Sequence, residues 1–182
     1  MTTSLDRQPT LVGERVALRP LRADDWDALF AVAADPLIWA DHPAHDRWKP
    51  EVFRAFFDDS LASGDALLAT DTATDAAIGH SRYDLAHAGP GEVEIGWTFL
   101  ARSHWGGATN AAMKALMLGH AFACPDIEQV IFRVGETNLR SRRALEKIGA
   151  RLTSRTQRDP GSCVCHLVYA VGRAEFGGRA SG

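Results

Sequence analysis

Hydrophobic and polar positions follow two different periods along this chain. Alternation with a period of two, or a short apolar run, predicts strands, and apolar spacing of three to four residues predicts helices. Strands are predicted over residues 15–19, 66–70, 76–83, 94–100, 129–134, 151–158 and 162–171. Helices are predicted over residues 24–34, 51–62, 113–121 and 138–148. This order predicts an α+β fold, a three-layer α/β sandwich in which a mixed, mostly antiparallel sheet of about seven strands carries helices on both faces.

The two ends of the chain differ in composition from the part between them. Residues 1–10 are polar and contain a proline, which predicts a disordered lead-in. Residues 172–182 are rich in glycine, arginine and alanine, which predicts a flexible tail. Since no internal repeat or linker interrupts residues 11–171, we expect them to form a single domain.

Composition excludes several classes of protein. With 182 residues, 46% of them hydrophobic, the chain can bury one sizeable core without a metal ion or disulfides. A net charge of −3 gives no electrostatic footprint for DNA. No apolar run approaches the roughly 20 residues of a membrane span, and no hydrophobic signal core is present, so we expect a cytoplasmic protein. Three cysteines, with Cys163 and Cys165 as an isolated C-x-C pair, predict reduced core residues and no metal site.

The most informative stretch is a strand, a glycine turn and a helix between Glu94 and Ala121. The turn holds Gly106 and Gly107 directly before the helical pattern. A helix start leaves backbone N–H groups unpaired and carries partial positive charge, and glycines let an anion approach them. By itself a glycine pair is a weak signal for an anion site, because such pairs are common in ordinary loops.

The segment that follows gives the turn a more specific meaning. Asn138-Leu-Arg-Ser141 begins the second helix of this region about thirty residues after the turn Trp105–Asn110. Together these segments resemble the two signatures of the GNAT superfamily of acyl-CoA N-acyltransferases, in particular its ribosomal-protein alanine N-acetyltransferases. The turn departs from the family pattern R/Q-x-x-G-x-G/A, because Trp105, Ala108 and Asn110 stand where Arg or Gln, the second Gly, and the final Gly or Ala are usual.

The resemblance implies acetyl-CoA as co-substrate, an amine as acceptor, and no metal. It also implies a possible homodimer. The pyrophosphate would meet the turn at Trp105, Gly106, Gly107, Ala108, Thr109 and Asn110. The pantetheine arm would meet backbone groups of Phe99 and Leu100, and Asn138 and Ser141 near the thioester.

Two residues are candidates for the chemistry of acetyl transfer. We expect Glu94 to act as the base that deprotonates the amine, with Glu92 in reserve. In this prediction Glu94 faces away from Ile95, Trp97 and Phe99; the alternative is a salt bridge to an arginine on a neighbouring element. Ser141 would protonate the departing thiolate, because Leu145 stands where many relatives carry a tyrosine.

The helix start offers a structural alternative for the same region. Asn138 and Ser141 suit the first turn of a helix, where their side chains bond the backbone. We expect Asn138 to cap the helix and also to touch the cofactor. Arg140, Arg142 and Arg143 are either solvated or close to the 3′-phosphate end of CoA.

The acceptor stays open at this stage. Residues 37–50 are irregular and hold Trp39, His42, His45, Arg47 and Trp48, which form either part of the core or a wall of the acceptor site. The sequence as a whole predicts an acetyl-CoA-dependent N-acetyltransferase that works by direct attack in a ternary complex. The alternatives are a catalytically weak acyl-CoA-binding or sensing module and, less favoured, a dinucleotide-binding enzyme, which would need a spaced glycine triad.

Overall fold

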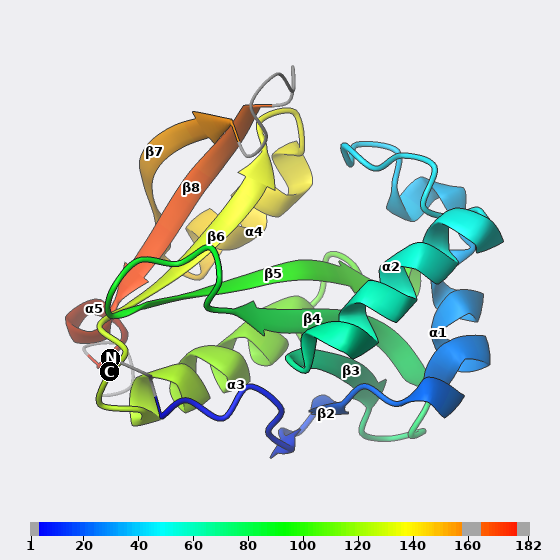
Figure 1. Cartoon of the computed structure of the whole chain (residues 1–182), viewed down its shortest axis with the longest axis horizontal. Coiled ribbons are helices and arrows are strands. Elements are labelled where there is room, and N and C mark those ends of the chain that lie inside the picture. Colours follow the sequence, from blue (N-terminus) through cyan, green and yellow to red (C-terminus); the bar gives the residue numbers. More distant parts are fainter. Residues whose placement is uncertain (1–3, 158–164, 178–182) are drawn as a thin grey trace.

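The computed structural model describes residues 4–157 and 165–177 (Figure 1). In this part of the chain one sheet of eight strands runs in the order β1-β2-β3-β4-β5-β6-β8-β7. Its strands are β1 (Leu11–Val12), β2 (Val16–Pro20), β3 (Ala66–Asp71), β4 (Ala77–Asp84), β5 (Glu92–Leu100), β6 (Gln129–Gly135), β7 (Arg151–Gln157) and β8 (Cys165–Gly172). The helices are α1 (Trp26–Ala33), α2 (Pro50–Ser63), α3 (Thr109–Ala123), α4 (Leu139–Lys147) and α5 (Arg173–Gly177). Short 3₁₀ turns are η1 (Ala23–Asp25), η2 (Pro36–Ile38) and η3 (Arg102–His104).

Helices cover both faces of the sheet and divide the core in two. On one face α3 packs through buried residues such as Met113 and Met117 against the sheet. On the other face α1 and α2 bury an aromatic cluster that includes Trp39, Phe53 and Phe57. The mixed three-layer architecture predicted from the hydrophobic pattern is confirmed.

The sheet opens in its middle. Neighbouring strands pair antiparallel except β5 and β6, which are parallel. Their pairing covers only Glu92–Glu94 against Gln129–Ile131. Beyond these residues the two strands separate, and Figure 1 shows them spreading from a common end into a V. Among the strands that the structure describes, none is therefore paired with the rest of β5 on its β6 side.

A bulge in β5 changes which way its side chains point. The register to β4 shifts between His80 and Arg82, where β5 inserts an extra residue. Trp97 lies there with φ of 51°, a backbone conformation that is uncommon for residues other than glycine. As a result Ile95 belongs to the core beneath α3, while Phe99 belongs to the aromatic core beneath α1 and α2. The prediction that Ile95 and Phe99 share a face is wrong, because the bulge resets the alternation.

The sheet and the chain ends also differ from the sequence-based expectations. The sheet has eight strands because the two-residue β1 pairs with β2, a contact too short to leave a pattern. Residues 4–10 are not a disordered lead-in, since Leu5 is buried in the core and Ser4 bonds Asp126. Part of the expected tail forms α5. Cys163 and the strand ends predicted within residues 158–164 lie outside the described residues.

No helix within residues 4–157 and 165–177 is both long and apolar enough to cross a membrane.

Candidate functional site

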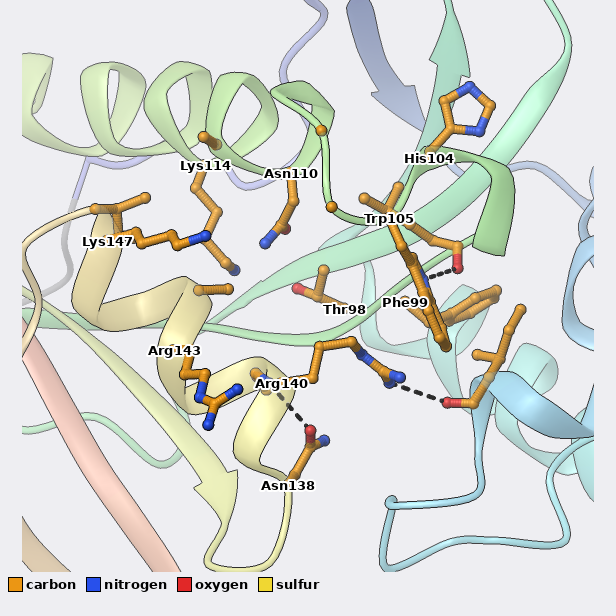
Figure 2. Close-up of a pocket in the computed structure, with 18 of the residues that line it drawn as sticks. Thr98, Phe99, His104, Trp105, Asn110, Lys114, Asn138, Arg140, Arg143 and Lys147 are labelled. Carbon is orange, nitrogen blue, oxygen red and sulfur yellow. Dashed lines mark hydrogen bonds between the residues drawn. The ribbon is translucent and has the colours of Figure 1, made fainter.

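A cavity of about 430 Å³ lies where β5 and β6 separate. Figure 2 shows α3 along one side of it and α4 along another, with the β5 strand between them. Its wall comes from β5 (Thr98, Phe99, Leu100), the turn before α3 (His104, Trp105, Gly106, Gly107), α3 (Asn110, Ala111, Lys114), the start and inner face of α4 (Asn138, Arg140, Ser141, Arg143, Ala144, Lys147, Ile148) and the segment around η2 (Ile38, Trp39, His42). Segments far apart in the sequence thus meet at one opening in the sheet.

The glycine turn presents backbone donors to this cavity. Gly106 has φ of 71°, which favours glycine, and neither Gly106 nor Gly107 has an atom within 4 Å of where a Cβ would lie. No side chain of the described residues caps the start of α3 at Ala108, so the first N–H groups of the helix keep their capacity to bind an anion. Trp105 fixes the turn to β5, because its Nε1–H donates to the Leu100 carbonyl at 2.9 Å.

The start of α4 forms the opposite wall. Asn138 is buried, and its Oδ1 accepts a hydrogen bond from the Ser141 N–H at 3.1 Å, which caps the helix. Ser141 also lines the cavity, and no hydrogen bond of its hydroxyl is found within the described residues. The cap is therefore made by Asn138 alone, which leaves the Ser141 hydroxyl available to a ligand.

Four cationic side chains face the cavity, namely Lys114, Arg140, Arg143 and Lys147. Lys114 is buried, with its Nζ 4.8 Å from the centre of the Phe132 ring, and burial lowers the pKa of this amine to about 8. Figure 2 shows the Lys114 and Lys147 side chains directed toward one another across the cavity. Among the described lining residues there is no Asp or Glu. Uncapped backbone N–H groups beside several cations suit a polyphosphate anion.

Not all arginines of α4 line the cavity. Arg140 lies 3.6 Å from the centre of the Trp105 ring and donates to the Ile38 carbonyl at 3.4 Å, and burial lowers its pKa. Arg142 instead donates to the Glu136 carbonyl at 3.0 Å, away from the cavity. Helical spacing alone did not separate these two arginines.

The structure brings together most, but not all, of the residues predicted for the site. Those that line the cavity are Phe99, Leu100, Trp105, Gly106, Gly107, Asn110, Asn138 and Ser141. Ala108 and Thr109 lie at the start of α3 without lining it.

Glu94 is also outside the cavity wall. Glu94 pairs with Ile131 where the β5–β6 pairing ends. Its buried carboxylate forms an ion pair with Arg133, two residues further along β6. This is the salt bridge expected from the sequence as the alternative to catalysis. The reserve residue, Glu92, accepts a hydrogen bond from the Gly89 N–H at 3.0 Å.

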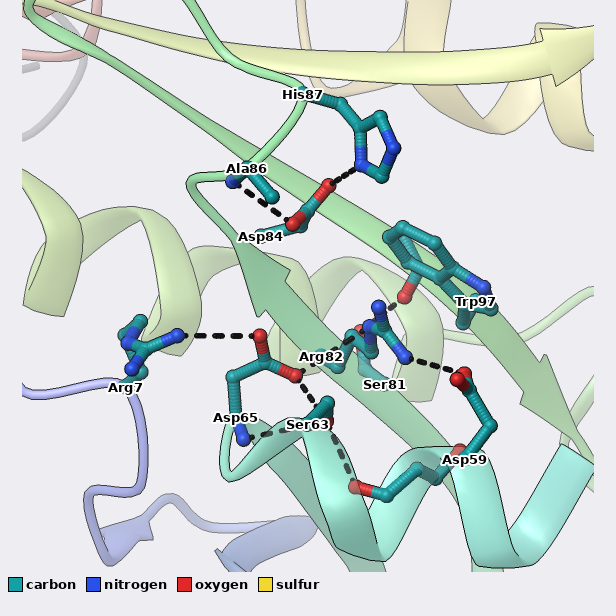
Figure 3. Close-up of polar contacts among 12 residues, drawn as sticks. Arg7, Asp59, Ser63, Asp65, Ser81, Arg82, Asp84, Ala86, His87 and Trp97 are labelled. Atoms are coloured by element: carbon teal, nitrogen blue, oxygen red, sulfur yellow. Dashed lines mark hydrogen bonds and ion pairs between the residues drawn. The ribbon is translucent and has the colours of Figure 1, made fainter. Parts of the chain in front are cut away.

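Sequence reasoning missed three polar residues of β4 that hold the bulge. His80 Nδ1 lies 2.9 Å from the Trp97 carbonyl oxygen, and Ser81 Oγ is 2.8 Å from Thr98 Oγ1. The Arg82 guanidinium lies 3.8 Å from the centre of the Trp97 ring and binds Asp59 at 2.9 Å (Figure 3). All three side chains are buried. Three consecutive polar residues within an apolar strand were the available signal.

His80 is held neutral by its surroundings. Burial lowers its pKa to about 4, so at neutral pH the ring carries one proton, which Nδ1 donates to the Trp97 carbonyl. The left-handed backbone at Trp97 is thus held by contacts from the neighbouring strand.

Solved structures with the same fold include acetyltransferases. A putative acetyltransferase from T. thermophilus is 27% identical, with 94% of this chain and 93% of that chain covered and a TM-score of 0.76. RimJ of Mycobacterium smegmatis, in complex with CoA-disulfide, is 19% identical (95% and 95% covered, TM-score 0.70). Spermidine N-acetyltransferase of Vibrio cholerae, in complex with CoA and spermine, is 12% identical (90% and 99% covered, TM-score 0.67).

A comparison with curated proteins finds no match. The family model described as the acetyltransferase (GNAT) domain matches residues 15–151, which include the glycine turn, the bulged strand and α4. This chain therefore belongs to the GNAT family of acetyltransferases and is an acyltransferase.

Proposed function

We propose that this protein transfers the acetyl group of acetyl-CoA to a primary amine by direct attack within a ternary complex. The observation that carries the proposal is the cavity between β5 and β6, which joins an uncapped helix start to four cations and has no carboxylate among its described lining residues. Structures of two relatives with the same fold contain CoA or a CoA derivative, which supports the same class of ligand here.

The chemistry of the wall suggests how acetyl-CoA binds. Its pyrophosphate would accept hydrogen bonds from the turn Gly106–Asn110, with Lys114 and Lys147 supplying charge. The pantetheine arm carries amides, and β5 beyond Glu94 has backbone groups with no strand beside them on the β6 side. An extended arm along Thr98–Leu100 would therefore complete the pairing of this edge.

The reaction needs only a few groups from the protein. The amine nitrogen attacks the thioester carbonyl carbon, a C–N bond forms, and the C–S bond then breaks. A backbone N–H of the bulged strand would stabilise the oxyanion, and the Ser141 hydroxyl would protonate the departing thiolate. Glu94 would take the amine proton through intervening water, because its carboxylate does not line the cavity.

A thermal-shift titration with acetyl-CoA, followed by a thiol-release screen of amines, tests the proposal. A ligand present at 100 times its dissociation constant adds about 2.7 kcal/mol of stability, which raises the melting temperature by several degrees in a domain of this size. We expect this shift with acetyl-CoA and none with NADH. Binding without release of thiol to any amine would favour the sensing module instead, and no binding would refute the proposal.

A further inference from the structure

Arg47 lies next to one end of the cavity wall, although it is not itself among the lining residues. That end is formed by Ile38, Trp39 and His42, in the segment that joins η2 to α2. The guanidinium carbon of Arg47 is 5.3 Å from the centre of the Trp39 ring and 4.4 Å from that of Phe56. Arg47 therefore contacts the cavity wall through Trp39, while Phe56 belongs to the aromatic core beneath α1 and α2.

This guanidinium lacks a carboxylate partner within residues 4–157 and 165–177. The acidic residues that act on it are Asp46 and Asp59, but burial outweighs them and lowers the pKa of Arg47 to about 10. Asp59 is bound by Arg82 at 2.9 Å, as Figure 3 shows. A half-buried cation without an ion pair costs folding free energy, and an anionic ligand would offset that cost.

Two further groups at this end have the same preference for an anion. Arg140 lines the cavity and, like Arg47, acts on His42 as a neighbouring positive charge. Burial and these charges lower the pKa of His42 to about 4, so its ring is neutral. His42 Nδ1 accepts a hydrogen bond from the Ala44 N–H at 2.9 Å, which leaves the proton on Nε2 as a donor.

We propose that Arg47, together with Arg140 and the Nε2–H of His42, binds a carboxylate of the acceptor, so that the acceptor is an amino acid or another amine that carries a carboxylate. The inference rests on the proposed acetyl transfer, in which Lys114 and Lys147 supply charge to the phosphates while Trp39 and His42 have no assigned role in binding CoA. The same positive groups disfavour a polyamine. The spermine-bound relative shares only 12% identity, and its similarity concerns the fold alone.

The test compares acceptors that differ only in the carboxylate. Each proteinogenic amino acid and its neutral amide would be assayed by thiol release at saturating acetyl-CoA, with spermidine as a cationic acceptor. For the best substrate we expect kcat/KM at least tenfold higher for the acid than for the amide. Short peptides with aspartate at the second position distinguish a carboxylate on a side chain from one on the amino acid itself.

Variants then assign the preference to Arg47. Arg47→Met should bring the ratio of acid to amide close to one while the KM for acetyl-CoA stays unchanged, and Arg47→Lys should keep part of the ratio. Arg54→Met is the matched control, because Arg54 also lies over an aromatic ring, 4.8 Å from that of Trp26, but is paired with Asp58. It should leave the ratio intact.

The outcomes separate this inference from the proposed function. Equal use of acids, amides and spermidine, or an unchanged ratio in Arg47→Met, would overturn the carboxylate site while leaving acetyl transfer in place. If no amine releases thiol, calorimetric binding of the same acids and amides to the protein with CoA still decides. The carboxylate site is supported if the protein binds an acid but not its amide and if Arg47→Met no longer binds the acid. It is overturned if neither the acid nor the amide binds.

Discussion

Replacing Lys114 with methionine should stabilise the free protein and weaken its binding of acetyl-CoA. Lys114 is buried and lines the cavity, and its Nζ has an aromatic ring beside it. Within the described residues it forms no ion pair. Methionine has similar length and no charge, so it removes the cost of burying the cation together with the attraction for phosphate.

The structure sets the size of the first effect. The pKa of Lys114 falls from 10.5 to about 8, and a difference of this size corresponds to about 3 kcal/mol. Because the pKa is lower in the folded chain, the cost is absent above pH 10.5, grows as the pH falls, and is complete below pH 8. Loss of the cation–π contact offsets about 1 kcal/mol. The net gain at pH 7 is about 2 kcal/mol, or roughly 4–8 °C in melting temperature.

The second effect follows from the charge lost at the phosphates. A hydrogen bond to a charged group contributes about 1.5–3 kcal/mol, so the dissociation constant for acetyl-CoA should rise about 10- to 100-fold. S-acetylpantetheine, which lacks the pyrophosphate, should bind the variant and the parent equally. Chemical denaturation at pH 7 and pH 10.5, with calorimetric titration of both thioesters, measures these quantities. A Lys114→Met protein that is less stable and binds acetyl-CoA as before would refute the reasoning, since Lys114 would then be a packing residue.

Four other substitutions test separate parts of the site. Ser141→Ala should lower kcat about 100-fold through loss of the proton donor, with acetyl-CoA binding unchanged; a change in melting temperature alone would leave it only a structural role. Glu94→Gln should lower kcat by a similar factor if the Glu94 carboxylate is the base. Arg133→Met removes the ion-pair partner of Glu94 and should keep turnover. Equal losses of kcat in the two variants would mean that the ion pair has a structural role only. Because the pKa of His80 is lowered to about 4, its contribution to stability is complete above pH 6.5 and lost as the pH falls to 4, by about 3 kcal/mol. The difference in unfolding free energy between the parent and His80→Gln should therefore change across this window, and a constant difference would contradict the assignment.

The hydrophobic pattern predicted most of the fold because its signals are local. Helical spacing in α2 and α3 reflects burial of one face of each helix, and the short apolar run of β3 reflects a strand buried on both faces. The same logic failed at Trp97, since Gly96 is only a weak indication of a bulge and does not fix where the alternation is reset. The bulge depends on partners from β4, which are fifteen or more residues away in the sequence.

The sequence predicted those parts of the candidate site that depend on a single local motif. The glycine turn and the Asn138 cap both act through the backbone of their own segment, and both were found. Lys114 was missed although it follows Asn110 by one helical turn, because a single lysine among apolar residues does not reveal that α3 faces a cavity there. Glu94 was predicted to be a base because a carboxylate in a central strand is costly unless it is solvated, paired or functional. Its ion pair with Arg133 depends on the parallel pairing of β5 and β6, which the sequence does not reveal.

Hydrogen exchange with and without acetyl-CoA tests the central claim, that the cofactor binds in the opening between β5 and β6. We expect slower exchange of the backbone amides in residues 98–110 and 138–148 when acetyl-CoA is bound. Residues of β7 and the outer face of α2 should exchange at unchanged rates, because they lie away from the cavity wall. Protection confined to other segments, or no protection at saturating acetyl-CoA, would contradict the account.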